Sequence, residues 1–219
     1  MSAGSGTSAT VQAAGGRSAW AAWLVPALRA LVALVAGLAV TFTSGHSAAF
    51  GLVVFGLFAV VEGAVVTAGA FGDRSERSSR GLFALQGVLT VAAGIAALAL
   101  PEGGVHYLVW VVSAWAVVTG ALELVSGIRA RGRVAAARDW MVIGGLTLIL
   151  AAALLVVPPD YTQTLGGIEQ VKGQLTASVV LVGIFGGWAI IAGVLLGIAS
   201  VSARGPRQPA AATAGKAES

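Results

Sequence analysis

The sequence predicts an all-α, polytopic membrane protein with six transmembrane helices, arranged as three repeated helical hairpins. Its composition, six long apolar runs and an internal repeat predict this fold. Of the 219 residues, 57% are hydrophobic and 10% are charged, and the mean hydropathy is +0.90. Soluble domains carry roughly 25% charged residues, so a soluble core of this length could not cover so much apolar surface. The composition therefore excludes an ordinary soluble domain.

The elements follow in order from the apolar runs. Residues 1–18 are mostly Gly, Ala, Ser and Thr, which predicts a disordered tail. A membrane domain follows over 19–203, and 204–219 are expected to form a second disordered tail. Crossing a bilayer takes ~20 helical residues. The predicted spans are 20–42, 48–71, 81–100, 106–128, 140–157 and 175–201, which form hairpins over about 20–71, 81–128 and 140–201.

The positive charges predict the orientation. Eleven of the thirteen Lys and Arg residues lie in the two tails and in the linkers 72–80 and 129–139. Since cytoplasmic segments carry an excess of Lys and Arg, we expect an inner (cell) membrane protein with both termini cytoplasmic. Topology explains this basic balance better than nucleic-acid binding, which needs a clustered basic patch. The expected partners are the lipid bilayer and either further copies of the chain or another membrane protein.

An internal repeat carries the hairpin prediction. A shift of 57 residues places Gly63 on Gly120 and Pro101 on Pro158, and the third hairpin carries 16 extra residues. The second helix of each hairpin repeats one motif: FAVVEG at 58–63, WAVVTG at 115–120 and WAIIAG at 188–193. Small residues four apart let membrane helices approach closely. The expected packing pairs are Ala59/Gly63, Ala116/Gly120 and Ala189/Gly193. We expect the aromatic residues that open the motif (Phe58, Trp115, Trp188) to lie against lipid or a neighbouring hairpin.

Three ionisable residues lie inside the predicted spans and are functional candidates because charge is costly there. Arg29 and Glu62 are each 14 residues from the outer end of their helix, a depth of roughly 21 Å, and should pair. The repeat places Gln86 and Thr119 at the equivalent positions as a neutral polar pair. The charged pair is a structural clamp, a proton-carrying site in a transport path, or a partner contact. Glu123 lies near the cytoplasmic end, where snorkelling predicts an anchor.

The outer face holds both histidines, with a longer loop at 158–174 that we expect to lie on the interface. The groups that could sense pH there, over roughly pH 4–7, are His46, His106, Glu102, Asp160 and Glu169. The alternative is that these are ordinary solvated loop residues. Two histidines in different loops do not predict a metal site.

Enzyme signatures are missing from the sequence. It has no cysteine, no phosphate-binding G-x-x-x-x-G-K, no G-x-S-x-G and no H-E-x-x-H. The many glycines lie inside apolar runs, where they pack helices. We therefore expect a non-enzymatic protein without a catalytic site, metal or cofactor.

The repeat resembles the HdeD-like acid-resistance membrane proteins over about residues 24–203. The resemblance rests on hairpins of about 57 residues, a proline after the first helix and the motif [FW]-A-[VI]-[VI]-x-G. Ser44, in place of a proline, and the long third loop depart from the pattern. The resemblance implies six membrane helices and a link to acid or envelope stress, with no catalytic residues to carry over. Eleven Arg against two Lys suggests a GC-rich bacterial genome.

Two functional classes follow. The first is a structural or interaction protein that acts by helix packing, oligomerisation or partner binding in stress tolerance. The alternative is a small proton-coupled transporter or channel with a polar cavity around Arg29, Glu62, Gln86 and Thr119.

Overall fold

The described part of the chain contains six long helices, and all six are long and apolar enough to cross a membrane. The computed structural model describes residues 6–72, 79–165 and 173–204. The predicted all-α membrane fold is confirmed, with one small sheet in addition. The elements are α1 (Gly6–Phe42), α2 (Ala48–Gly72), α3 (Arg80–Ala99), α4 (Gly104–Ala130), α5 (Ala137–Val156), β1 (Thr162–Leu165), β2 (Gly173–Thr176) and α6 (Ala177–Arg204).

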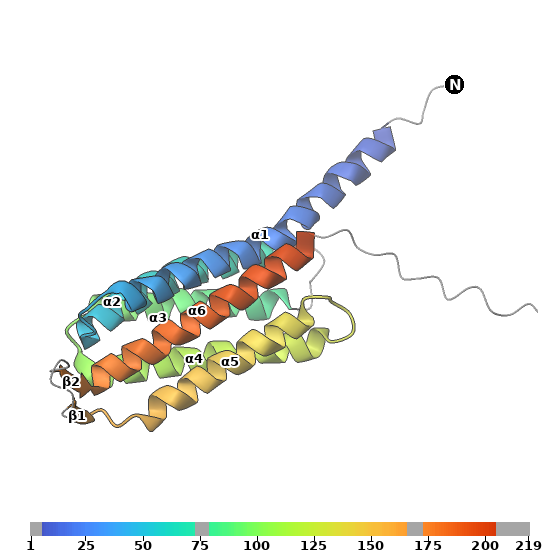
Figure 1. Ribbon diagram of the computed structural model, residues 1–219. Helices are drawn as coiled ribbons and strands as arrows, with labels where there is room; N and C mark the ends of the chain where they lie inside the picture. Colours follow the sequence, from blue (N-terminus) through green and yellow to red (C-terminus); the bar gives the residue numbers. More distant parts are fainter. Residues whose placement is uncertain (1–5, 73–78, 166–172, 205–219) are drawn as a thin grey trace, which may run out of the picture.

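The ends of α3 and α5 lie where the prolines in the sequence predict them, whereas the start of α1 differs from the prediction. α3 and α5 each end two residues before a proline, Pro101 and Pro158, because the residue before a proline is disfavoured in helical conformation. α1 begins at Gly6, so the helix covers most of the segment predicted to be a disordered tail. A stretch that continues an existing helix needs no new nucleus. The early part of α1 projects beyond the body (Figure 1).

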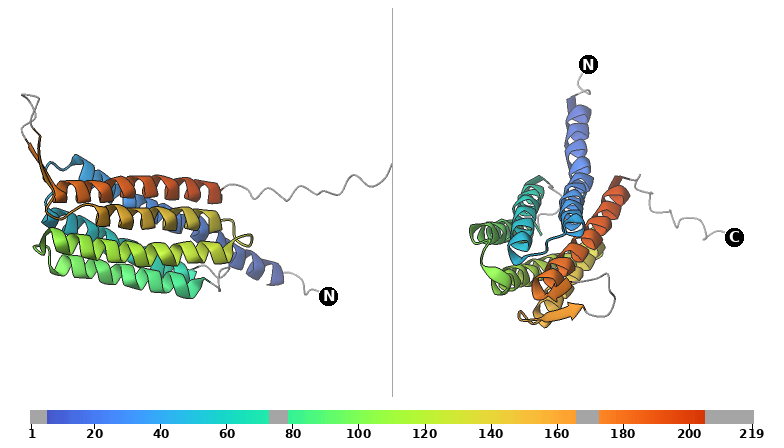
Figure 2. Two further views of the ribbon diagram at one scale, coloured as in Figure 1. Left: turned by 90° about the horizontal axis from the view of Figure 1, so that it is seen from below. Right: turned by 60° about the vertical axis from the view of Figure 1, so that its left-hand side comes forward.

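The six helices form a closed ring with an inner and an outer set. α2, α4 and α6 contact one another around the axis, and half of the residues in their spans are buried. In α1, α3 and α5, a third or fewer are buried. Each outer helix lies between two inner ones, so that α1 closes the ring against α6 (Figure 2). The most extensive contacts join α2 to α3, α4 to α5 and α6 to α1. Packing is therefore closest between successive repeats rather than within the predicted hairpins.

The motif glycines make these three contacts equivalent. A Cβ added at Gly63 would meet the carbonyl oxygen of Gly87 at 2.6 Å, and one at Gly120 would meet that of Gly144 at 3.0 Å. A Cβ at Gly193 would lie 3.1 Å from the carbonyl oxygen of Ala30 in α1. The motif alanines Ala59, Ala116 and Ala189 are fully buried. The third copy of the motif thus packs on the first helix of the chain, as the other two pack on the helix that follows them.

The long third loop contains a β-hairpin that the sequence analysis did not predict. β1 and β2 pair antiparallel, with Thr162 opposite Thr176 and Leu165 opposite Gly173. The strands lie at the end of the bundle where α5 gives way to α6 (Figure 1). Each strand has only four residues, and a run that short does not show the alternating pattern by which a strand is recognised in a sequence. Residues 166–172 of the expected interfacial segment lie outside the described part of the chain.

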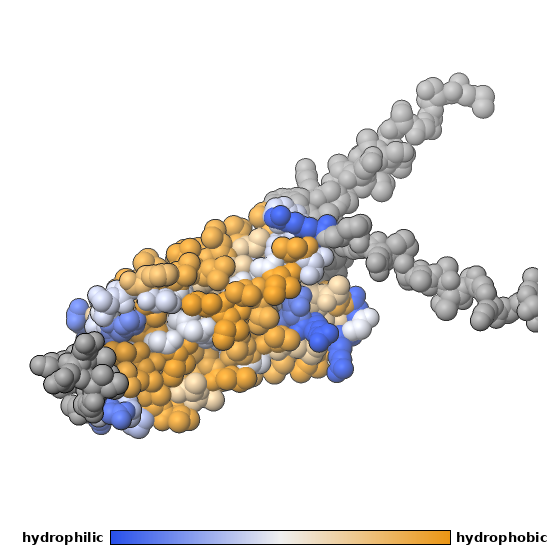
Figure 3. Space-filling model, viewed as in Figure 1, coloured by the Kyte–Doolittle hydropathy of each residue, from blue (hydrophilic) through white to orange (hydrophobic). Residues whose placement is uncertain are grey.

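The surface matches a membrane-embedded body. Apolar side chains cover the middle of the bundle, and hydrophilic residues gather at its two ends (Figure 3). Large exposed hydrophobic side chains occur on all six helices, among them Leu31, Leu57 and Ile149. The arginines Arg80, Arg129, Arg131, Arg133, Arg138 and Arg204 all lie at or beyond the helix ends opposite the β-hairpin.

Candidate functional site: an aromatic triad and a buried charge network

The aromatic residues of the repeated motif meet on the axis of the ring. Phe58, Trp115 and Trp188 are buried, with ring centroids 5.5–5.8 Å apart in all three pairings. Each pair is edge to face, at interplanar angles of 87–88°, an arrangement that the aromatic quadrupole favours. Phe55 and Phe185 pack on the same group. Of the two expected environments, lipid or a neighbouring hairpin, the structure shows the second. The triad fills the centre of the bundle.

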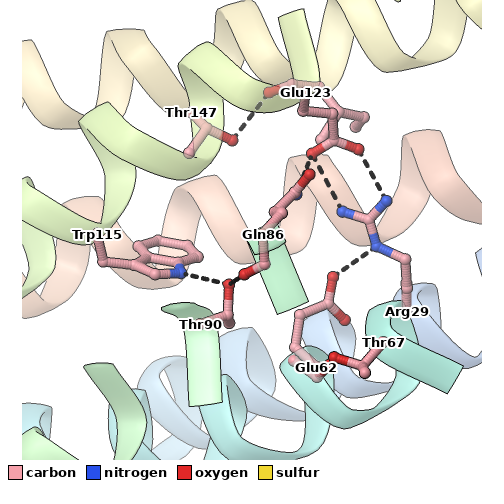
Figure 4. A network of polar contacts seen from close by, with 10 residues as sticks. Arg29, Glu62, Thr67, Gln86, Thr90, Trp115, Glu123 and Thr147 are labelled. Atoms are coloured by element: carbon pink, nitrogen blue, oxygen red, sulfur yellow. Dashed lines mark hydrogen bonds and ion pairs between the residues drawn. The ribbon is translucent and has the colours of Figure 1, made fainter. Parts of the chain in front are cut away.

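A charge network lies next to the triad and is centred on Arg29. The Nε of Arg29 donates to Oε1 of Glu62 at 2.6 Å, so the predicted pair is formed. Its Nη1 and Nη2 donate to Oε1 and Oε2 of Glu123 at 2.8 and 3.2 Å. The guanidinium thus lies between two carboxylates, one on α2 and one on α4 (Figure 4). Whether the pair serves as a clamp or carries protons stays a prediction.

The prediction for Glu123 is wrong in its placement. Glu123 is 2% exposed, and it accepts from Arg29 and from Gln86 rather than reaching the cytoplasmic interface. Distance to the helix end suggested snorkelling, but the side chain faces the axis. The sequence held a usable signal, because Glu123 follows Trp115 and Thr119 at intervals of four residues and so shares their helix face.

The neutral pair expected in the second repeat is not joined by a hydrogen bond. Nε2 of Gln86 donates to Oε2 of Glu123 at 3.2 Å, while Oγ1 of Thr119 donates to the carbonyl oxygen of Trp115 at 2.7 Å. Thr90 connects the two features, since its Oγ1 donates to the Gln86 carbonyl oxygen and accepts from Nε1 of Trp115. The second repeat therefore completes the network of the first instead of repeating it.

A small cavity of about 20 Å³ adjoins the network and the triad. Its lining includes Arg29, Glu62, Gln86, Thr90, Trp115, Thr119, Glu123, Thr147 and Trp188. A single water requires at least about 10–15 Å³. Within the described part of the chain, three buried atoms at the cavity have no hydrogen-bond partner: Oε2 of Glu62, Oε1 of Gln86 and Nε1 of Trp188. The site can therefore hold a water, but it is too small for an organic solute.

The residues expected on the outer face come from three loop regions of the chain. Nε2 of His46 lies 2.9 Å from the carbonyl oxygen of Val40, near the end of α1. Glu102 and His106 are exposed around the start of α4, and Asp160 is exposed in the loop after α5. Glu169 lies outside the described residues. Across residues 6–72, 79–165 and 173–204, no group of three His, Asp or Glu side chains could hold a metal ion.

Comparison with known proteins identifies the repeat. The family described as a short repeat of unknown function (DUF308) matches residues 28–95 and again residues 85–157. The two matches begin 57 residues apart, which is the period found in the sequence. Comparison with curated proteins and with solved structures gives no match. Because the two matches together cover more than half of its length, the chain belongs to the DUF308 short-repeat family.

Proposed function

We propose that this protein is a non-enzymatic, multi-pass protein of the bacterial cell membrane that acts through its packed helical body. In this proposal it holds copies of itself or another membrane protein and supports tolerance of acid or envelope stress. Membership of a family that includes the HdeD-like membrane proteins supports the link to stress. The single observation that carries the mechanical role is the closed axis, where Phe58, Trp115 and Trp188 fill the space between the inner helices.

The charge network supports the same role. Arg29, Glu62, Gln86 and Glu123 come from four different helices, α1 to α4, and their hydrogen bonds join the first two repeats. Removing one partner of a buried ion pair typically costs about 3–5 kcal/mol, so such a network fixes how the repeats dock. A rigid body with a lipid-facing apolar surface suits a protein that works by packing and contact.

The distribution of charge supports cytoplasmic termini. α1 begins and α6 ends at the arginine-rich end of the bundle, and cytoplasmic segments are the ones enriched in Lys and Arg. Reporter domains fused to either terminus should be active only when the reporter functions in the cytoplasm. If a reporter that functions only outside the cytoplasm is active at a terminus, that terminus lies outside and the proposed orientation is wrong.

The alternative function, a small proton-coupled transporter or channel, is tested by proton flux. The purified protein is placed in liposomes under a pH gradient, alongside the Glu62→Gln variant and empty liposomes. We expect no flux above empty liposomes from either protein, because the axis is filled and the cavity holds about one water. If the wild-type protein conducts protons and the Glu62→Gln variant does not, our proposal is wrong and the protein is a transporter or channel.

The stress role is tested in cells. A strain lacking the gene should survive acid or envelope stress less well, and the wild-type gene should restore survival. The Trp110→Ala variant, altered at an exposed position, should restore it as well, whereas Trp115→Ala in the triad should not. Equal survival with and without the gene would contradict the stress role.

A further inference from the structure

The charge network is not neutral when all its groups are ionised. The titratable groups that line the cavity are one guanidinium, Arg29, and two carboxyls, Glu62 and Glu123. The other helices contribute no further charge there. α3 presents Gln86 and Thr90, α5 presents Ile143 and Thr147, and α6 presents Trp188, Ala192 and Leu196. With both carboxyls ionised, one negative charge is left over in a buried, membrane-embedded site, where an uncompensated charge is expensive and is normally removed by taking up a proton.

The hydrogen bonds indicate which carboxyl takes that proton. Glu123 accepts three hydrogen bonds, two from Arg29 and one from Gln86. Glu62 accepts one, at Oε1, from Nε of Arg29. Its other oxygen, Oε2, is buried without a partner among the described residues. Because hydrogen bonds from charged donors stabilise a carboxylate, the negative charge belongs on Glu123 and the proton on Oε2 of Glu62.

The cavity supplies the remaining partners. Oε1 of Gln86 is an acceptor and Nε1 of Trp188 a donor, both buried without a partner among the described residues, and both residues line the cavity together with Glu62. A water molecule has two acceptor sites and two donors, and buried waters typically bind about three polar groups. The cavity has room for about one water, which can accept a hydrogen bond from Oε2–H of Glu62. A proton on Oε2 of Glu62 together with a water in the cavity would give that buried oxygen a hydrogen-bond partner.

We propose that this cavity is a proton-binding site in which Glu62 carries a proton on Oε2 at neutral pH, hydrogen-bonded to water in the cavity. Arg29 and Glu123 form the neutral ion pair that stays beside it. This inference goes beyond the proposed function, because a bound proton requires no conduction through the axis. The aromatic triad lies between the site and the β-hairpin end.

Infrared spectroscopy of the full chain in lipid bilayers tests the proposal, since a protonated carboxyl has a C=O stretching band that a carboxylate lacks. At neutral pH we expect such a band in the wild type, shifted in D₂O. Glu62→Gln should remove it and still fold, because the amide has nearly the same shape as the protonated acid. Glu102→Gln, at an exposed outer position, is the matched control and should leave the band unchanged.

A second variant tests the charge count without altering Glu62. In Glu123→Gln, Glu62 is the one carboxyl left to balance Arg29, so it should ionise and the band should disappear. In Arg29→Met both carboxyls lose their positive partner and should both be protonated, so the intensity of the band should double. The absence of a band in the wild type, or a band that Glu62→Gln leaves in place, would overturn the proposal. Persistence of the band in folded Glu123→Gln would also overturn it. If Glu123→Gln does not fold, the comparison of Glu62→Gln with its control decides.

Discussion

Replacing Gly63 with alanine should separate two helices that now touch through their backbones. The new Cβ would lie 2.6 Å from the carbonyl oxygen of Gly87 and 2.7 Å from the amide nitrogen of Val91. Both neighbours are backbone atoms, so α2 and α3 must move apart by several tenths of an ångström. Such overpacking costs about 1–3 kcal/mol, while Gly→Ala in a helix returns about 1 kcal/mol. We expect a net loss of about 1 kcal/mol in the free energy of unfolding.

A matched control separates the clash from helix propensity. A Cβ at Gly183, in α6, meets no atom within 4 Å, so Gly183→Ala should stabilise the protein by up to about 1 kcal/mol. The difference between the two variants then measures the clash alone, about 1–3 kcal/mol. Gly120→Ala, whose nearest neighbour is at 3.0 Å, should fall between them. The assay is unfolding by SDS in mixed micelles, followed by helical circular dichroism. Equal stability of Gly63→Ala and Gly183→Ala would refute the close backbone contact.

Two further predictions concern the axis and the network. Trp115→Ala should lower the free energy of unfolding by about 3–5 kcal/mol, the usual cost of truncating a buried large aromatic. Trp110→Ala should change it little, because Trp110 is 69% exposed; thermal unfolding in detergent compares the two. Glu123→Gln should cost about 1.5–3 kcal/mol, since it weakens both hydrogen bonds from Arg29 while Glu62 ionises and balances the charge. Glu62→Gln should cost less than about 1 kcal/mol. The same SDS titration checks this order, and a larger loss for Glu62→Gln would contradict it.

The helices and their repeat were predictable because both depend on local patterns in the chain. Apolar runs of sufficient length set the spans, and the prolines Pro101 and Pro158 set two of the helix ends. The motif at 58–63 marked the residues that approach another backbone. The sequence did not show which helix each motif meets, since a small-residue face fits any similar face. The ring closure between α6 and α1 therefore required the structure.

The candidate site was predicted in part for a similar reason. Equal depth in antiparallel neighbours was enough to pair Arg29 with Glu62. Depth could not place Glu123, because its distance from the helix end says nothing about which way its side chain points. Its spacing from Trp115 and Thr119 did carry that information. The three-way aromatic contact on the axis depends on all three repeats at once, and no local pattern encodes it.

The closed ring of three repeats is tested most directly by a disulfide between its first and last helices. The chain has no native cysteine, so two cysteines can be introduced without interference. A Cβ at Gly197 would lie 4.0 Å from the Cβ of Ala30, within the roughly 3.5–4.5 Å that disulfides span. Oxidising Ala30→Cys/Gly197→Cys in membranes should give an internal cross-link between α1 and α6 in nearly every molecule. Ala30→Cys/Gly183→Cys should give none. Failure of the first pair to cross-link, in protein that otherwise folds, would contradict the closed ring.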